Sequence, residues 1–272
     1  MERVLLGYDG TAGADAALDW VTDRALRRDA RVEVVIVTNP LLQDRPMAEE
    51  QLARAERRLH TQIPALPVET ARIDGRMPGA LVDAAADADI LVIGADPDRP
   101  AREALHGWMS LRVSSRSSVP TCVVPAGWSA LSGPVTLALA TDTSSDAASG
   151  YAAREAHATG ESLRVVHAWS TPLSSAQSSA IAVPRREARD QHQELLTRSI
   201  DGIRQLFPGL VVEPVLVADN AVAALSRAAA DSSLLVMGTH GKGVLAGGFS
   251  GSVGQDLIGS IRTPVVVVPS SG

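Results

Sequence analysis

The chain contains an internal repeat, and this feature most narrows the folds that it can adopt. Residues 87–95 (DADILVIGA) and 118–125 (SVPTCVVP) recur 144 residues later as 231–239 (DSSLLVMGT) and 262–269 (RTPVVVVP). Similarity at one fixed spacing indicates two copies of one structural unit. Because the chain has 272 residues, each copy has the length of an ordinary domain.

The two copies differ in length near their beginnings. Residues 4–11 (VLLGYDGT) resemble residues 136–143 (TLALATDT), at a spacing shorter than that of the later matches. An insertion explains the difference, and we expect it at residues 170–184, whose Ser, Ala and Pro content is typical of a mobile loop. The predicted domains are residues 1–127 and 134–270.

Each copy alternates short Val, Ile and Leu runs with stretches of helical periodicity. This alternation is typical of parallel strands joined by crossover helices, and apolar runs such as 234–237 suit strands covered on both faces. The predicted fold class is α/β, with two tandem doubly wound five-stranded parallel sheets and helices on both faces. The expected strands lie near 3–8, 32–37, 68–73, 90–94, 120–124, 135–140, 163–168, 211–217, 234–238 and 264–268.

Composition and charge argue against several classes of protein. The chain is 45% hydrophobic with a net charge of −6, so we expect a packed core and no general attraction for nucleic acid or anionic lipid. The only cysteine, Cys122, cannot form an internal disulfide. No apolar run approaches the ~18 residues of a membrane span, and no signal peptide is indicated. We therefore expect a cytoplasmic protein.

A glycine-rich segment after the fourth strand of the second copy carries the clearest chemical signal. It contains Gly238-x2-Gly241-x9-Gly251-Ser252. Glycines let the backbone approach an anionic ligand and permit amide nests. Gly251-Ser252-Val253 then begins a helix whose free N–H groups favour phosphate. The spacing predicts a phosphate site, although strand-to-helix loops rich in glycine also occur without function.

Asp142 ends the first strand of the second copy and is expected at the same crevice. It could accept ribose hydroxyls or hold a cation, or it could cap the following helix together with Ser144 and Ser145. A P-loop is excluded because Gly243, not Ser or Thr, follows Lys242. A dinucleotide fingerprint is excluded because neither copy has G-x-G-x-x-G after its first strand.

Taken together, these residues resemble the universal stress protein family in its tandem form, over nearly the whole chain. ATP-binding members carry G-x2-G-x9-G-(S/T), which Gly238, Gly241, Gly251 and Ser252 match, and an Asp at the end of the first strand, which Asp142 matches. The resemblance implies strand order 3-2-1-4-5 in each sheet. That order would bring Asp142 beside Gly238.

The resemblance also implies a ligand and its contacts. The implied cofactor is ATP, with Mg²⁺ held partly by Asp142. Adenine contacts are implied at Ala168 and Met237, and phosphate contacts near Val253. The predicted binding residues are Ala140, Thr141, Asp142, Ala168, Met237, Gly238, His240, Gly241, Lys242, Gly243, Ser250, Gly251, Ser252 and Val253.

The first copy departs from this pattern. It keeps Asp9-Gly10-Thr11 and Gly94, but Pro97 and Trp108 stand at the positions of the second glycine and the serine. Proline lacks an N–H donor, and an indole replaces a hydroxyl at the helix start. We therefore interpret residues 1–127 as a degenerate domain and residues 134–270 as the domain that binds ATP.

Several single residues have two interpretations. Lys242, the only lysine, either contacts phosphate or lies at a solvated loop tip. We favour a surface position for His240, a satisfied core position for His167 and a solvated helix start for Arg185-Arg186. No catalytic residue is predicted.

The function that these features predict is a nucleotide-dependent stress-response switch. No group besides Asp142 offers the base and cation site of a strong ATPase, so slow hydrolysis or autophosphorylation stays open. ATP is expected to shift loops 170–184 and 239–250 and so to change the affinity for an unidentified protein partner. The alternatives are an interaction or scaffold protein with nucleotide as a structural ligand, and a weak ATPase.

The two copies are expected to meet through their fifth strands. Thr121–Val124 and Val265–Val268 form apolar edges that would otherwise be open to aggregation, and the resemblance implies the same intramolecular pseudo-dimer. No sequence feature indicates or excludes a homodimer of whole chains.

Overall fold

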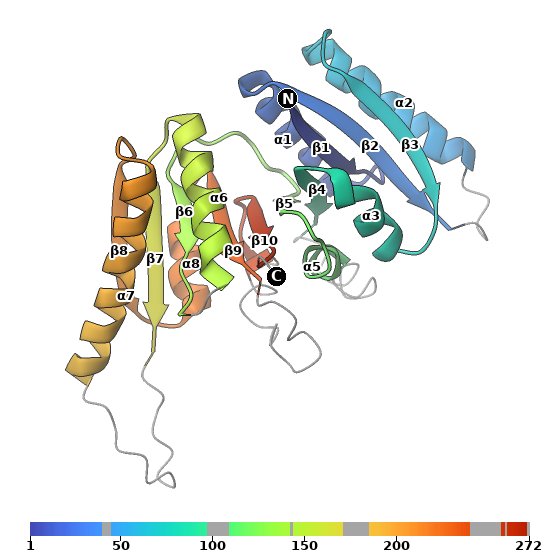
Figure 1. Cartoon of the computed structure of the whole chain (residues 1–272). Helices are drawn as coiled ribbons and strands as arrows, with labels where there is room; N and C mark the ends of the chain where they lie inside the picture. The colour runs from blue at the N-terminus through green and yellow to red at the C-terminus, as the bar shows by residue number, and fades with distance from the viewer. Residues whose placement is uncertain are drawn as a thin grey trace, which may run out of the picture.

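The computed structural model describes residues 1–39, 45–96, 109–141, 144–170, 185–239, 257–258 and 260–270. Strands and helices alternate along the chain (Figure 1). The strands are β1 (Glu2–Gly7), β2 (Ala30–Thr38), β3 (Val68–Asp74), β4 (Ile90–Ala95), β5 (Thr121–Pro125), β6 (Val135–Ala138), β7 (Leu163–Trp169), β8 (Val212–Ala218), β9 (Leu234–Gly238) and β10 (Val265–Val268). The helices are α1 (Ala12–Arg27), α2 (Arg45–Gln62), α3 (Gly79–Ala84), the 3-10 turn η1 (Ala85–Asp87), α5 (Met109–Ser114), α6 (Ser144–Thr159), α7 (Arg185–Leu206) and α8 (Ala221–Ala229).

The strands form one sheet in the order β3-β2-β1-β4-β5-β10-β9-β6-β7-β8. Counted within each half, this is the order 3-2-1-4-5, and every pair inside a half is parallel. The predicted α/β class and strand order are therefore confirmed. In such an order, the first strand lies between the second and the fourth, and ligand crevices form at the carboxyl ends of these strands.

The two predicted sheets are joined into one by their fifth strands. β5 and β10 pair in antiparallel fashion, with Val123 opposite Val265 and Cys122 opposite Val266 (Figure 1). Both strands are buried along their whole length. The prediction that these apolar edges meet is confirmed, and the pairing leaves neither of them as an open edge.

Helices cover both faces of the sheet. Leu18 of α1, Leu52 of α2 and Leu196 of α7 belong to the core on one face, to which α6 also contributes. The core on the other face includes Leu81 of α3 and Leu225 of α8. Because both faces are covered, strands such as β4 are apolar at consecutive positions, as expected for buried parallel strands.

Helices α1 and α6 connect the two halves through a buried ion-pair cluster. The Arg24 guanidinium on α1 donates to both carboxylate oxygens of Glu155 on α6, at 2.9 and 2.8 Å, and to Glu2 at 2.8 Å. Arg28 also donates to Glu155, at 3.1 and 2.8 Å. The side chains of Arg24 and Glu155 are only 5% and 7% exposed, so water contributes little to their solvation.

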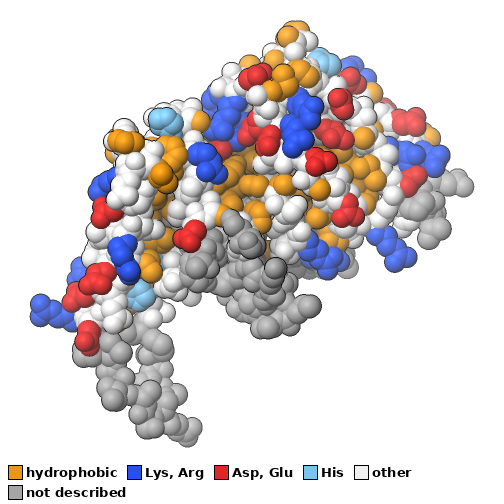
Figure 2. Space-filling model, viewed as in Figure 1, with side chains coloured by type: hydrophobic (Ala, Val, Ile, Leu, Met, Phe, Trp, Pro, Cys, Tyr) orange, Lys and Arg blue, Asp and Glu red, His pale blue; other side chains and the backbone are white. Residues whose placement is uncertain are grey.

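The visible surface is mixed in charge. On the face in Figure 2, the described Arg side chains alternate with Asp and Glu side chains rather than gathering by sign. Within the described ranges, no helix is both long and apolar enough to cross a membrane.

Candidate functional site

The described part of the predicted binding site lies at the carboxyl ends of β6, β7 and β9. Ala138, the last residue of β6, is the register partner of Val166 on β7 and of Met237 on β9. Ala168 lies two residues beyond Val166. Gly238 directly follows Met237 and ends β9. Five predicted residues, Ala140, Thr141, Ala168, Met237 and Gly238, therefore come from neighbouring strand ends.

The exposure of these positions changes along the strands. In β9, Leu234, Leu235 and Val236 are buried, whereas Met237 and Gly238 are half-buried. Ala138, Ala140 and Ala168 are half-buried as well, and Thr141 is exposed. Most of these side chains are a single methyl group or none. The predicted adenine contacts at Ala168 and Met237 stay a prediction.

The predicted phosphate-binding segment lies outside the described residues. Asp142, whose carboxylate is expected to face that segment, also lies outside the described residues. So does the loop predicted at 170–184, except for residue 170. The predicted site residues concerned are Asp142, His240, Gly241, Lys242, Gly243, Ser250, Gly251, Ser252 and Val253. Their mutual geometry stays a prediction. Arg186, at the start of α7, is exposed, as expected for a solvated helix start.

A pair of histidines at the end of β7 is a feature that the sequence did not reveal. His167 is 1% exposed, and its Nδ1 lies 2.8 Å from the Leu139 carbonyl oxygen, so Nδ1 carries the proton and donates. Its Nε2 lies 2.8 Å from Nδ1 of His192 on α7. The His192 ring stacks on Trp169 at a centroid distance of 5.1 Å. The interpretation of His167 as a satisfied core group is confirmed.

The histidine pair makes stability depend on pH. Burial, and then the charge of His167, lower the pKa of His192 from its ordinary 6.5. The unfolded chain therefore binds more protons than the folded chain just below pH 6.5, and stability is lost as the pH falls through this range. We expect His192→Gln, whose amide can still donate to His167, to flatten the melting temperature profile between pH 5 and 8. His60→Gln serves as the control, and parallel profiles of His192→Gln and the unmodified chain would contradict the assignment.

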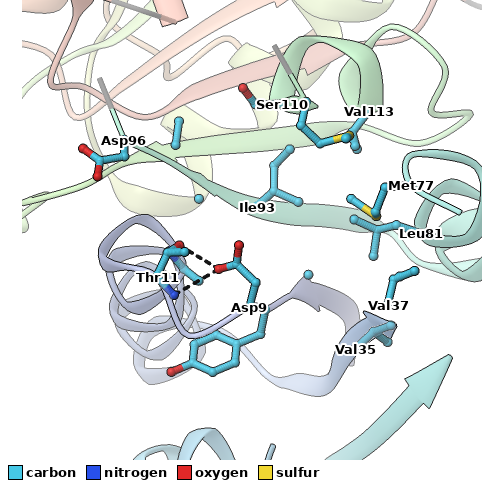
Figure 3. A pocket seen from close by; sticks show the side chains of 16 residues that line it. Asp9, Thr11, Val35, Val37, Met77, Leu81, Ile93, Asp96, Ser110 and Val113 are labelled. Carbon is cyan, nitrogen blue, oxygen red and sulfur yellow. Dashed lines mark hydrogen bonds between the residues drawn. The ribbon is translucent and has the colours of Figure 1, made fainter. Parts of the chain in front are cut away.

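The equivalent crevice of the first half contains a cavity of about 300 Å³ (Figure 3). Strand register establishes the equivalence. In the first half, Gly7 is the register partner of Val35 and Ile93. In the second half, Ala138 is the register partner of Val166 and Met237. The residues that line the cavity are Gly7, Tyr8, Asp9, Thr11, Ala14, Val35, Val37, Met77, Leu81, Ile93, Gly94, Ala95, Asp96, Met109, Ser110 and Val113. Its backbone frame was visible in the sequence as Asp9-Gly10-Thr11 and Gly94, but its apolar wall was not.

Local hydrogen bonds hold the acidic edge of this cavity. Thr11 caps α1, and its hydroxyl accepts from the Ala14 N–H at 3.2 Å. Oδ1 of Asp9 accepts from the N–H of Thr11 at 3.0 Å and from its hydroxyl at 2.6 Å, as the dashed lines in Figure 3 mark. Gly10 adopts φ +73°, which a side chain would disfavour. The turn therefore fixes the Asp9 carboxylate beside the helix start.

The strand register corrects one detail of the repeat. Gly7 corresponds to Ala138, so Val4–Gly7 match Val135–Ala138, and the predicted match of residues 4–11 with 136–143 is wrong by one residue in the strand. Between the matched strand end and the Asp, the second half is then two residues longer than the first.

Comparison with known proteins agrees with this architecture. A model of the universal stress protein family matches residues 1–125 and 133–269. Two universal stress proteins of Mycobacterium tuberculosis (strain ATCC 25618 / H37Rv) are 24% and 26% identical to this chain. The first alignment includes 97% of this chain and 94% of the relative, and the second includes 98% of this chain and 97% of the relative. The crystal structure of a universal stress protein from Archaeoglobus fulgidus DSM 4304 superposes with a TM-score of 0.70 at 18% identity, covering 99% of this chain and 96% of that one.

Fold and sequence together define the class as a tandem α/β protein whose two halves share the strand order 3-2-1-4-5. The chain belongs to the universal stress protein family, in the two-domain form.

Proposed function

We propose that the second half, residues 134–270, binds ATP and that the protein is a nucleotide-dependent stress-response switch. The observation that carries the proposal is the spacing Gly238-x2-Gly241-x9-Gly251-Ser252, which begins at the carboxyl end of β9. A glycine-rich backbone that leads into a helix start offers N–H donors to phosphates.

The two halves differ in ways that favour the second half for a nucleotide. Ala168 occupies the position of Val37 in the first half, as the register of β7 with β6 and of β2 with β1 indicates. The smaller side chain leaves more room for a base. Trp108 stands in the first half at the position of Ser252, so only the second half offers a hydroxyl donor there.

The proposed site uses main-chain amides for the phosphates and side chains for the rest. Ala168 and Met237 would contact adenine, while Ala140, Thr141 and Asp142 would lie near the ribose. Asp142 would also help to hold Mg²⁺, which neutralises phosphate charge when bound. The remaining proposed contacts are His240, Lys242, Gly243, Ser250 and Val253. We place the protein in the cytoplasm, which is consistent with its single, buried and unpaired Cys122.

Isothermal titration calorimetry with MgATP tests the proposed site. We expect one ATP per chain and, for Ser252→Ala, a weakening of roughly tenfold to a hundredfold, because a hydrogen bond to a charged phosphate is worth about 1.5–3 kcal/mol. Gly241→Val is expected to weaken ATP binding further, since it places a branched side chain in the proposed phosphate loop. Gly202→Ala, on α7, should leave affinity unchanged. Two ATP molecules per chain, or full affinity in both variants, would overturn the assignment.

A second measurement separates the switch from its alternatives. Product analysis with ATP and Mg²⁺ should give turnover below roughly 1 per second, the lower range of typical enzymes. Once a protein partner is identified, its affinity should change on addition of ATP and should not change in Ser252→Ala. An affinity that ignores ATP would favour a scaffold with a structural nucleotide.

A further inference from the structure

We propose that the cavity of the first half binds a small apolar amine rather than a nucleotide. The proposal concerns Asp9, Ser110 and the apolar wall of the cavity. It goes beyond the proposed function, which assigns ATP to the other half of the chain.

The wall of the cavity is apolar. Met77 and Leu81 from the β3–α3 region lie across from Ile93 on β4, with Val37 from β2 at one side (Figure 3). Ligand pockets start at about 300 Å³, and an apolar cavity of ~150 Å³ holds benzene. The cavity of about 300 Å³ therefore suits a ligand with roughly twice the volume of benzene, such as one fused aromatic ring system with a short side chain.

The edge of the cavity is acidic. Asp9 follows β1, and Asp96 follows β4 (Figure 3). None of the described residues that line the cavity is Lys, Arg or His. The Asp9 carboxylate would repel a triphosphate placed here, and none of the described lining residues would offset this repulsion with a positive charge, whereas an ammonium group would be attracted. Charge therefore selects a cation at the edge and an apolar body inside.

A buried hydroxyl supplies independent support for a ligand. Ser110 on α5 lines the cavity, is 4% exposed, and its Oγ has no hydrogen-bond partner within the described ranges. Its neighbour one turn later, Ser114, is buried too but donates to the Ser110 carbonyl oxygen at 2.7 Å. An unsatisfied buried hydroxyl is costly. A ligand with a ring N–H could donate to the Ser110 hydroxyl, and this would remove the cost.

Three indole probes of similar shape test the charge preference. Tryptamine is a cation, tryptophol is neutral and indole-3-acetate is an anion at pH 7. The chain contains five methionines, and only Met77 and Met109 line this cavity, whereas Met237 lies at the proposed ATP site. Spectra of ¹³C-methyl methionine therefore report the two halves separately in the intact chain.

We expect tryptamine to shift the Met77 and Met109 signals, tryptophol to bind more weakly and indole-3-acetate to bind weakest. MgATP should shift Met237 and leave Met77 and Met109 unchanged. The failure of ATP to shift Met237 would count against the proposed function alone, because the first-half signals respond independently.

Variants locate the contacts. Asp9→Asn, which keeps the acceptor for Thr11, should weaken tryptamine binding by about threefold to fivefold, the range of a solvent-exposed ion pair, and leave tryptophol unaffected. Asp29→Asn is the matched control, because its 77% exposed side chain precedes β2 at the opposite end of the strands. Val37→Phe should fill the cavity and abolish the shifts, and an unchanged melting temperature would confirm that it folds.

Preferential binding of indole-3-acetate or of MgATP at Met77 and Met109 would overturn the proposal. So would the absence of any shift with all three indoles, or equal weakening by Asp9→Asn and Asp29→Asn.

Discussion

Glu155→Ala is expected to destabilise the folded chain by about 3–5 kcal/mol, the cost of removing one partner from a buried ion pair. Glu155 accepts hydrogen bonds from both Arg24 and Arg28. Without it, Arg24 would keep only Glu2, at the edge of the cluster, while remaining 5% exposed. Equilibrium unfolding in urea measures the change, and Glu194→Ala on the exposed face of α7 should stay within about 0.5 kcal/mol.

A second variant separates loss of charge from loss of packing. Because well-packed apolar residues can replace a buried ion pair at little cost, Arg24→Met combined with Glu155→Leu should recover most of the lost stability. Arg28 and Glu2, at 20% and 21% exposure, can turn to water in that variant. A single Glu155→Ala change that costs less than about 1 kcal/mol would show that the cluster does not hold the two halves together.

The same cluster predicts a response to acid. Burial acts to raise the pKa of Glu155, but hydrogen bonds from Arg24 and the charges of Arg24 and Arg28 outweigh it and lower that pKa below the ordinary 4.5. Stability from this carboxylate is therefore present above pH 4.5 and lost as the pH falls through the lowered value. Burial likewise opposes the charge on Arg24, yet the hydrogen bonds to Glu155 and Glu2 raise its pKa.

The repeat made the sheet predictable, whereas the buried cluster of Arg24, Arg28, Glu2 and Glu155 was not predictable from the sequence. The spacing of 87–95 and 231–239 required two similar units, and the apolar runs at 121–124 and 265–268 required cover for their edges. The contact between Arg24 and Glu155 joins residues 131 apart, on helices that only the pairing of β5 with β10 brings together. Nothing in a single charged position indicates such a partner.

The site was predictable where backbone chemistry decided it. Gly94 and Asp9 were recognisable as a kept frame, because glycine and a turn aspartate have distinct conformational roles. The wall formed by Met77, Leu81 and Val113 could not be separated from ordinary core residues by periodicity. The one-residue error in matching β1 with β6 has another cause: the second half has two more residues between the strand end and the Asp than the first, so no match without a gap fits both features.

The two halves thus share one frame and differ in what lines it. In both, the first strand lies between the second and fourth, so a ligand over the strand ends must contact three strands at once. The first half lines that place with Val37 and Ile93, and the second with Ala168 and Met237. This difference in lining is the structural basis of the two different ligands proposed above.

Gly94→Ala is expected to destabilise the first half by about 3 kcal/mol or more, because overpacking against backbone cannot be relieved by a rotamer change. A Cβ at Gly94 would lie 2.0 Å from the carbonyl carbon of Gly13 and 2.4 Å from the nitrogen of Ala14. A Cβ at Gly13 would lie 2.8 Å from the Ala95 carbonyl oxygen. Two facing glycines therefore let the first turn of α1 rest directly on β4.

The close approach also positions the acidic edge of the cavity, because α1 begins two residues after the Asp9-Gly10 turn. We expect Gly94→Ala to move this turn, to lower stability and to weaken tryptamine binding. Gly202→Ala is the control: its new methyl group would have no atom within 4 Å, and it should stabilise α7 by up to about 1 kcal/mol. Urea unfolding and the Met77 signal measure both effects. If Gly94→Ala unfolded at the same urea concentration as the unmodified chain, the backbone of α1 would have to lie farther from Gly94 than the distances above state. The close contact between α1 and β4 could then no longer explain the fixed position of Asp9.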